Sequence, residues 1–127
     1  IQTPWCKIGL GINYDLRFPK LSEYYFKNDC KIICYLANMS QDTGNKHWKL
    51  LNRSRALDTQ SFVLTCSGAN NSSTKYNMYG HSLVVNPNGD VKEILNSNNE
   101  FNSAKENKSK AEQDVIEKKK LCSTACK

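Results

Sequence analysis

One stretch near the start of the chain decides the fold, and it reads Lys7-Ile8-Gly9-Leu10-Gly11-Ile12-Asn13-Tyr14-Asp15-Leu16-Arg17-Phe18-Pro19. Residues 7–12 alternate enough to predict a β-strand, and its two glycines indicate that another backbone or a ligand comes close. The strand ends at Asn13, and a polar turn over residues 14–17 follows. A residue at such a strand end is held on rigid backbone and points outward, where active-site residues often lie.

The next segment predicts an α/β unit. Pro19 suits the first turn of a helix, which we expect over residues 21–27. Residues 30–36 form a continuous apolar run bounded by turn residues, which is typical of a buried strand. A strand, a helix and a strand joined by short connections form one unit, and its two strands are expected to be neighbours in a sheet.

Further elements follow in the same alternating order. We predict a polar loop over residues 37–45, a helix over residues 46–59 with Asn45 as its N-cap, and a strand over residues 61–67. A small-polar loop over residues 68–77 comes next. Asn88-Gly89 then separates two β-rich runs, residues 82–85 and 91–95, which is a strong signal for a hairpin.

The composition limits the classes of partner. The 127 residues predict one domain, and the net charge of +6 is spread along the chain. The only dense basic run is Lys118-Lys119-Lys120, and acidic residues lie near it, so we interpret it as solvated surface and expect no nucleic-acid partner. No apolar run is long enough to span a membrane, and we expect no membrane association.

The six cysteines do not predict a disulfide scaffold or a metal site. Cys6, Cys30, Cys34 and Cys66 lie inside apolar runs, where free cysteine behaves as a small hydrophobe. We therefore expect reduced thiols in a cytoplasmic protein. No histidine stands at ligand spacing beside a cysteine pair, so we expect no metal. Ile1 is not a start methionine, so a segment can be missing before it and organellar targeting stays open.

The character of the chain changes after Leu95. Residues 96–107 are polar and lack periodicity, and residues 108–121 carry only a thin apolar stripe. We therefore divide the chain into a folded part, residues 1–95, and a Lys/Asn-rich tail, residues 96–127, that is disordered or loosely helical.

Three stretches resemble signatures of the nitrilase, or carbon-nitrogen hydrolase, superfamily. In the opening stretch the family has Gly-hydrophobic-Cys-Tyr-Asp-hydrophobic-Arg-Phe-Pro-Glu, whereas this chain has Asn13 at the cysteine position and Lys20 at the glutamate position. The second signature resembles a family helix and reads Thr43-Gly44-x-x-His47-Trp48-x-Leu50-Leu51-x-Arg53-Ser54-Arg55-Ala56. The third resembles a late hairpin and reads Gly80-His81-Ser82-Leu83-Val84-Val85-Asn86-Pro87-x-Gly89-Asp90-Val91. The details are most similar to the omega-amidase branch.

The resemblance implies half of a four-layer α-β-β-α sandwich, because only the C-terminal half of the family's domain is matched. It also implies hydrolysis of a dicarboxylate monoamide such as α-ketoglutaramate to an acid and ammonia, without a cofactor. In that family a cysteine nucleophile works with a glutamate base, a second glutamate and a lysine, and these partners of the cysteine belong upstream of residue 1. By resemblance, the backbone N–H of Tyr14 would be one oxyanion donor.

The replacement of the nucleophile predicts that the chain is inactive on its own. The carboxamide of Asn13 has no thiol, hydroxyl or accessible ionised nucleophile. By resemblance, Met39 and Thr43 lie in the loop that faces substrate, and we expect Arg17 to pair with a substrate carboxylate. For Arg17 a structural ion pair with Asp15 or Asp58 stays open as the alternative.

Two hypotheses about function follow. The first is a piece, or a degenerate member, of an omega-amidase-like hydrolase. The second is a non-catalytic module, a pseudoenzyme, that pairs with itself or with a homologous subunit through the helices at 21–27 and 46–59, which resemble those of the family's dimer interface. Packing, rather than catalysis, is the favoured role of His47 and Trp48. Because half a sandwich leaves an apolar sheet face uncovered, we also expect poor solubility or oligomerisation.

Overall fold

The computed structural model describes residues 1–69 and 76–95 of the chain. In chain order the elements are β1 (Lys7–Ile12), the 3₁₀ turn η1 (Asn13–Arg17), α1 (Pro19–Lys27), β2 (Cys30–Leu36), α2 (Gln41–Thr59), β3 (Phe62–Cys66), β4 (Leu83–Val85) and β5 (Val91–Ile94). The predicted tail, residues 96–127, and residues 70–75 of the predicted loop lie outside the described residues.

The strands form one sheet in the order β1-β2-β3-β4-β5. β1, β2 and β3 run parallel, and β4 and β5 are added antiparallel to them. The predicted α/β unit and the predicted late hairpin are both confirmed. Gly89 in the hairpin has φ of 79°, a left-handed conformation that glycine adopts without a steric penalty.

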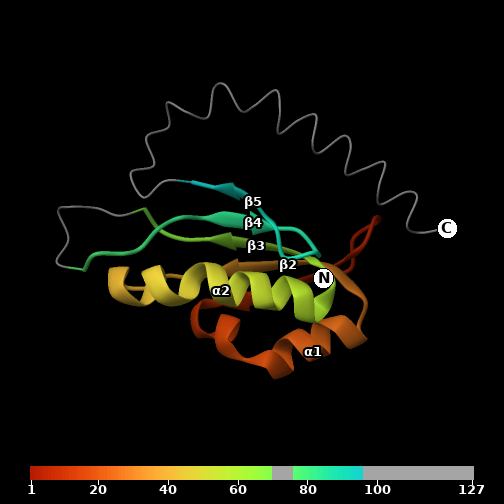
Figure 1. The fold of residues 1–127 in the computed structure, drawn as a ribbon. Coiled ribbons are helices and arrows are strands. Elements are labelled where there is room, and N and C mark those ends of the chain that lie inside the picture. The colour runs from red at the N-terminus through yellow and green to blue at the C-terminus, as the bar shows by residue number, and fades with distance from the viewer. Residues whose placement is uncertain (70–75, 96–127) are drawn as a thin grey trace.

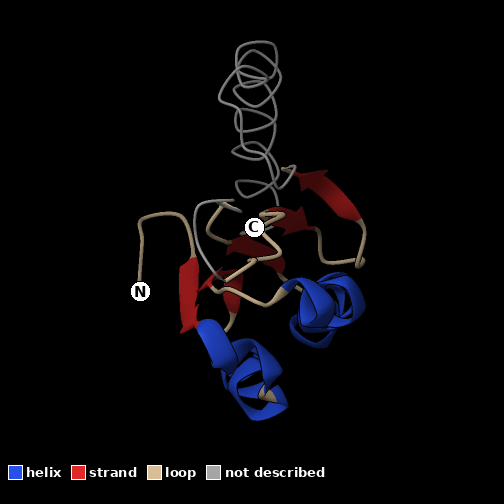
Figure 2. Ribbon diagram, turned by 90° about the vertical axis from the view of Figure 1, so that its left-hand side faces the viewer, coloured by secondary structure: helices blue, strands red, loops and turns tan. Residues whose placement is uncertain are grey.

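Both helices cover the same face of the sheet (Figure 1), and the view turned by 90° shows no helix of the described residues on the other face (Figure 2). The α/β fold class predicted from the sequence is therefore confirmed, as one helix layer on one sheet layer. The core lies between these layers.

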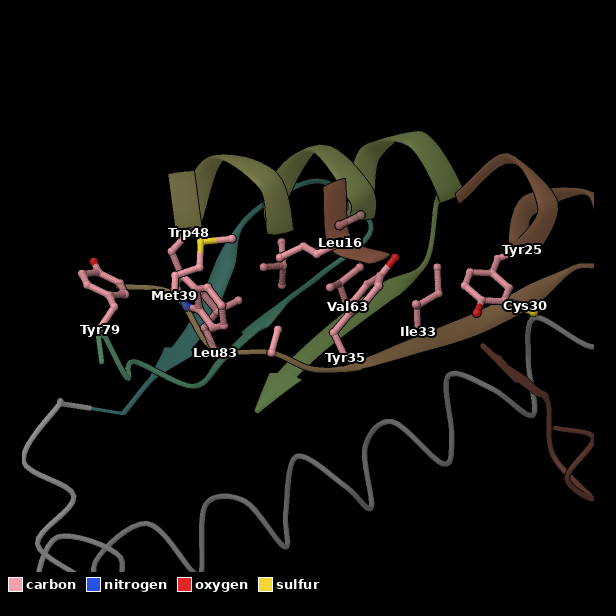
Figure 3. Packing of buried hydrophobic residues seen from close by; sticks show 13 residues of the cluster. Leu16, Tyr25, Cys30, Ile33, Tyr35, Met39, Trp48, Val63, Tyr79 and Leu83 are labelled. Atoms are coloured by element: carbon pink, nitrogen blue, oxygen red, sulfur yellow. The ribbon is translucent and has the colours of Figure 1, made fainter. Parts of the chain in front are cut away.

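The core is built from alternate residues of each strand. Ile33 and Tyr35 of β2, Val63 of β3 and Val85 of β4 are buried with 0–1% exposure, on the face of the sheet that the helices cover (Figure 1). Figure 3 shows Tyr35 and Ile33 rising from the sheet toward the helices. The buried Trp48 of α2 closes one end of this core.

A pair of buried polar side chains ties α2 to the sheet. The hydroxyl of Thr65 in β3 donates to Oδ1 of Asn52, and Nδ2 of Asn52 donates to the carbonyl oxygen of Trp48 over 2.9 Å. Both polar side chains are at most 3% exposed, and buried polar groups need such partners.

The start of α2 differs from the prediction. The helix begins at Gln41, not at residue 46, and Ser40 is the N-cap, whereas Asn45 is an exposed residue inside the helix. Ser40 has extended backbone, and its carbonyl oxygen accepts the N–H of Gly44 over 2.8 Å, which closes the first turn. α1 likewise begins at Pro19 rather than at residue 21.

The strand at residues 30–36 has the predicted bounds but is not buried throughout. Its burial alternates, and Leu36 is 65% exposed. A sheet with helices on one face buries alternate residues only, so the apolar run reflects two different environments. The next strand is one residue shorter than predicted at each end.

Candidate functional site

Asn13 lies where β1 ends, and its backbone is unusual. Its φ is 45°, a region that asparagine enters more readily than most residues other than glycine. The carboxylate of Asp15 accepts the N–H of Ile12 over 2.9 Å and thereby fixes the sharp turn into η1. Tyr14 follows at the start of η1, where helix N–H groups have no partner within the helix. The side chain of residue 13 is therefore exposed at a rigid strand end.

The carboxyl ends of β1, β2 and β3 meet at this edge of the sheet. The N–H of Asn38, just after β2, donates to Oδ1 of Asn13 over 3.4 Å. Oδ1 of Asn38 accepts the N–H of Gly68 over 2.7 Å and the hydroxyl of Ser67 over 3.0 Å, and both donors follow β3. The backbone N–H of Ser67 in turn donates to Ser82 Oγ over 2.9 Å. A row of amides and hydroxyls therefore follows the edge of the sheet.

Asn38 is the residue of this site that sequence reasoning missed. The signal was available, because Asn38 comes two residues after a strand and parallel strands bring their carboxyl ends to one edge. A loop after β2 is predicted, but it ends at Ser40 rather than at residue 45. The residues expected to bind substrate there are Met39, the neighbour of Asn38, and Thr43, which lies in the first turn of α2.

Met39 and Thr43 are both engaged within the protein. Met39 is 8% exposed and packs in the core near Trp48 (Figure 3), and its carbonyl oxygen accepts the N–H of Tyr79 over 2.9 Å. Thr43 Oγ1 accepts the hydroxyl of Ser40 over 3.0 Å in the first turn of α2. Their role toward a substrate stays a prediction.

Arg17 is half-buried at the end of η1. Its Nη2 lies 3.3 Å from Nδ1 of His47, and its guanidinium lies 5.4 Å from the ring centre of Tyr14. Asp58, one of the two ion-pair partners left open for Arg17, is instead held by Arg55 over 2.6 Å. The other, Asp15, caps the turn.

Arg55 is the buried cation that supports the site turn. It is 5% exposed, and its Nε donates to the carbonyl oxygen of Leu16 over 2.9 Å. Leu16 is the fully buried residue of η1. The second signature helix therefore fixes the backbone that presents Asn13.

Trp48 packs, as expected, whereas His47 makes the contact with Arg17. The indole of Trp48 is fully buried, its Nε1 donates to the carbonyl oxygen of His81 over 2.8 Å, and its ring meets that of Tyr79 edge to face. Tyr79 also stacks on the ring of His81. These contacts hold residues 79–81 against the beginning of α2.

Among the described residues, the one thiol at the same end of the sheet as Asn13 is that of Cys66, which is level with Ile12 but two strands away, at the end of β3. Cys6, Cys30, Cys34 and Cys66 are free thiols. Cys30 pairs with Lys7 at the opposite end of β1 from Asn13. Burial raises the pKa of Cys34, which disfavours its thiolate. Within residues 1–69 and 76–95, no three metal-ligating side chains gather to hold an ion, and neither helix is long and apolar enough to cross a membrane.

The family match covers most of the chain. Residues 1–103 match the Carbon-nitrogen hydrolase family. The chain belongs to that family. It is 46% identical over 90 residues to omega-amidase NIT2 of Homo sapiens and 44% identical over 90 residues to omega-amidase NIT2 of Danio rerio. Each alignment covers 71% of this chain, and 33% of the human and 32% of the zebrafish protein, so the chain spans about a third of these relatives.

Solved structures agree with this assignment. Nit3 of Saccharomyces cerevisiae, from the nitrilase superfamily, superposes with a TM-score of 0.70 at 40% identity, over 72% of this chain and 34% of that one. The C. elegans NitFhit protein superposes with a TM-score of 0.68 at 34% identity, over 72% of this chain and 22% of that one. The expected family and fold are thus confirmed.

Proposed function

We propose that the chain is part of an omega-amidase-like hydrolase and that it does not itself perform the nucleophilic step. The observation that carries this proposal is Asn13, which occupies the exposed strand end where the family's signature has its cysteine. The likeness to omega-amidases supports a dicarboxylate monoamide as the substrate class of the whole enzyme.

The chemistry explains why the replacement matters. In an amidase of this type a thiolate attacks the amide carbon, and N–H donors stabilise the tetrahedral oxyanion. Ammonia leaves, and water then cleaves the thioester with the help of a general base. A carboxamide at position 13 cannot form the covalent bond that begins this sequence. Loss of a covalent nucleophile costs on the order of 10⁶-fold in kcat.

The test measures ammonia released from α-ketoglutaramate. The chain is assayed alone and with Asn13→Cys, each with and without an upstream half supplied from a relative. We expect turnover only when both repairs are present, because the base and the oxyanion lysine of the family come from the upstream half. Turnover by the unaltered chain would contradict the proposal, and no turnover in any combination would favour a non-catalytic role.

A non-catalytic pairing module is the second candidate. The outer sides of α1 and α2 expose Tyr24, Phe26, Leu50 and Leu57, each at least 47% exposed, among charged residues. This mixture suits a protein interface. Co-purification of the chain with a full-length homologue, lost on Leu50→Glu and kept on Lys49→Glu, would support it.

A further inference from the structure

The backbone of Asn38 is held between two anchored neighbours. The N–H of Ala37 donates to the carbonyl oxygen of Cys66 over 3.0 Å, and Ala37 is 4% exposed. On the other side, Met39 is buried, and its carbonyl oxygen accepts the N–H of Tyr79 over 2.9 Å. The loop after β2 is therefore fixed on both sides of Asn38, although Asn38 itself is exposed.

The side chain of Asn38 adds a third anchor, in the segment that follows β3. Its Oδ1 accepts the N–H of Gly68 over 2.7 Å and the hydroxyl of Ser67 over 3.0 Å. A Cβ on Gly68 would lie 3.3 Å from this oxygen, which is tighter than an ordinary van der Waals contact, so glycine leaves the room that the side chain needs. Because the side chain is exposed, water would satisfy its oxygen equally well. The two bonds therefore act on the position of the loop.

With the loop held in this way, the N–H of Asn38 faces the side chain of residue 13. Its nitrogen lies 3.4 Å from Oδ1 of Asn13. This distance is long for an N–H···O bond, whose usual range is about 2.7–3.2 Å, and the acceptor is a neutral carboxamide. An N–H group binds an ionised acceptor more strongly and at shorter range. The donor is therefore directed at the place where negative charge lies when an ionised side chain stands at position 13.

We propose that Asn38 is a positioning residue for the nucleophile of the reaction, an inference that rests on the proposed omega-amidase-like function. Its side chain holds the loop so that its own backbone N–H donates to a thiolate at position 13, where this chain has asparagine instead. A thiol attacks an amide as the thiolate, and a directed donor favours this form. Because the donor is fixed before the reaction starts, it does not have to turn toward the charge.

Asparagine at position 13 uses the same donor without ionising. Its carboxamide oxygen accepts the N–H of Asn38 and carries no net charge. The geometry of the loop therefore suits any hydrogen-bond acceptor at this position, and a thiolate, which carries a full charge, would be stabilised most by it.

A purely structural role of Asn38 makes a different prediction. Ser67 is 7% exposed, and its hydroxyl needs a partner, which Oδ1 of Asn38 supplies. If this is the only role, loss of the Asn38 side chain changes the stability of the chain and the access to residue 13. It then leaves the ionisation of a thiol at position 13 unchanged. The pH dependence of that thiol's reactivity therefore distinguishes the two roles.

The experiment introduces a thiol by Asn13→Cys in the full 127-residue chain and follows its alkylation by iodoacetamide from about pH 5 to about pH 10. Trypsin releases residues 8–17, which contain none of the six native cysteines, so mass spectrometry of this peptide reports position 13 alone. We expect the rate to reach half of its maximum at a pH below about 8.5, the value for an unperturbed thiol.

Adding Asn38→Ala to Asn13→Cys should move this midpoint to higher pH. The alkylation at about pH 7 should then be about threefold to tenfold slower, because the N–H is no longer held toward the thiolate. At about pH 10 the two rates should converge, since the thiol is ionised in both chains.

Two further variants, each combined with Asn13→Cys, serve as controls. Ser67→Ala removes one of the two donors to Asn38 and should move the midpoint less than Asn38→Ala does, because the N–H of Gly68 still holds the side chain. Asn45→Ala is the matched change of an asparagine to alanine, at an exposed position of α2, and should leave the midpoint unchanged.

An unshifted midpoint in the chain with Asn38→Ala would overturn the proposal. A difference in rate that persists at about pH 10 would also overturn it, because it indicates altered access to the thiol rather than altered ionisation. Neither result depends on amide hydrolysis, so the two proposals can fail separately. A shifted midpoint without turnover by the repaired enzyme would refute the proposed function and retain the donor, whereas turnover with an unshifted midpoint would do the opposite.

Discussion

Nε of Arg55 donates a hydrogen bond to the carbonyl oxygen of Leu16 over 2.9 Å, from inside α2 to the turn that carries Asn13. The same guanidinium reaches Asp58 through Nη1 over 2.6 Å. Arg55 is 5% exposed, so its buried guanidinium needs hydrogen-bond partners of this kind within the protein. One side chain thereby couples the packing of the helix layer to the geometry of the site.

Arg55→Lys should lower the free energy of unfolding by about 2 kcal/mol, because a single ammonium cannot reproduce the two directed bonds of the guanidinium. Urea unfolding followed by circular dichroism measures this change. The matched control is Asp58→Asn, which removes the ion pair on the half-exposed side and should cost less than about 1 kcal/mol. Equal losses in the two variants would mean that the ion pair, and not the bond to Leu16, carries the stability.

Gly44→Ala should destabilise the protein although alanine is the better helix former. A Cβ at this position would overlap Cγ of Tyr79, whose ring is buried against Trp48. Overpacking of this kind costs about 1–3 kcal/mol, which exceeds the gain in helix propensity of about 1 kcal/mol. Asn45→Ala, at the next and exposed position of α2, should instead be neutral or slightly stabilising. A Gly44→Ala variant with an unchanged Tm would show that Tyr79 moves aside freely.

The sequence was sufficient for the strands, because apolar runs and an Asn-Gly hairpin are local signals, and for the family, because three stretches resemble its signatures. It failed at the start of α2, where the helix is set by Ser40 and by the packing of Gly44 beneath Tyr79, which is a tertiary contact. It also failed to pair Arg55, rather than Arg17, with Asp58. Whether Arg17 or Arg55 contacts Asp58 depends on how η1 and α2 are oriented relative to each other. A residue pattern within one element does not reveal that orientation.

At the candidate site, too, one feature was predictable from the sequence and another was not. The strand end at Asn13 was predictable from the run that precedes it. The link from Asn13 to Asn38 was not, because it requires the register between β1 and β2, which places Ile12 level with Leu36.

Alkaline pH should weaken the protein through Tyr35. Burial raises the pKa of its phenol to about 12, above the ordinary value near 10. The folded state therefore keeps the neutral phenol while the unfolded chain ionises, so stability is unaffected below pH 10 and falls as the pH rises from 10 to 12. The loss attributable to Tyr35 reaches about 2 kcal/mol at pH 12.

Tyr35→Phe provides the comparison, with unfolding measured in urea at about pH 9 and about pH 11.5. The variant should lose less stability between these values than the unaltered chain does. Burial also raises the pKa of Tyr25, so a smaller dependence should remain in the variant. If the free energy of unfolding falls equally in the two proteins between these pH values, the phenol of Tyr35 becomes hydrated before it ionises.

Asn13→Cys, the change that restores the family's nucleophile, should cost about 1 kcal/mol of stability, because residue 13 has φ of 45° and the left-handed region is costly for most L-residues. Asn13→Ala should cost the same, whereas Asn13→Gly should be neutral or stabilising, since glycine adopts this backbone freely. The three variants distinguish backbone strain from loss of a hydrogen bond. If the 3.4 Å hydrogen bond from the N–H of Asn38 contributes to stability, its loss lowers the stability of all three variants, including Asn13→Gly. Thermal melts of the three proteins decide between these causes. If strain is responsible, a catalytic cysteine at this strand end destabilises the fold that presents it, and asparagine relieves that strain as it removes the nucleophile.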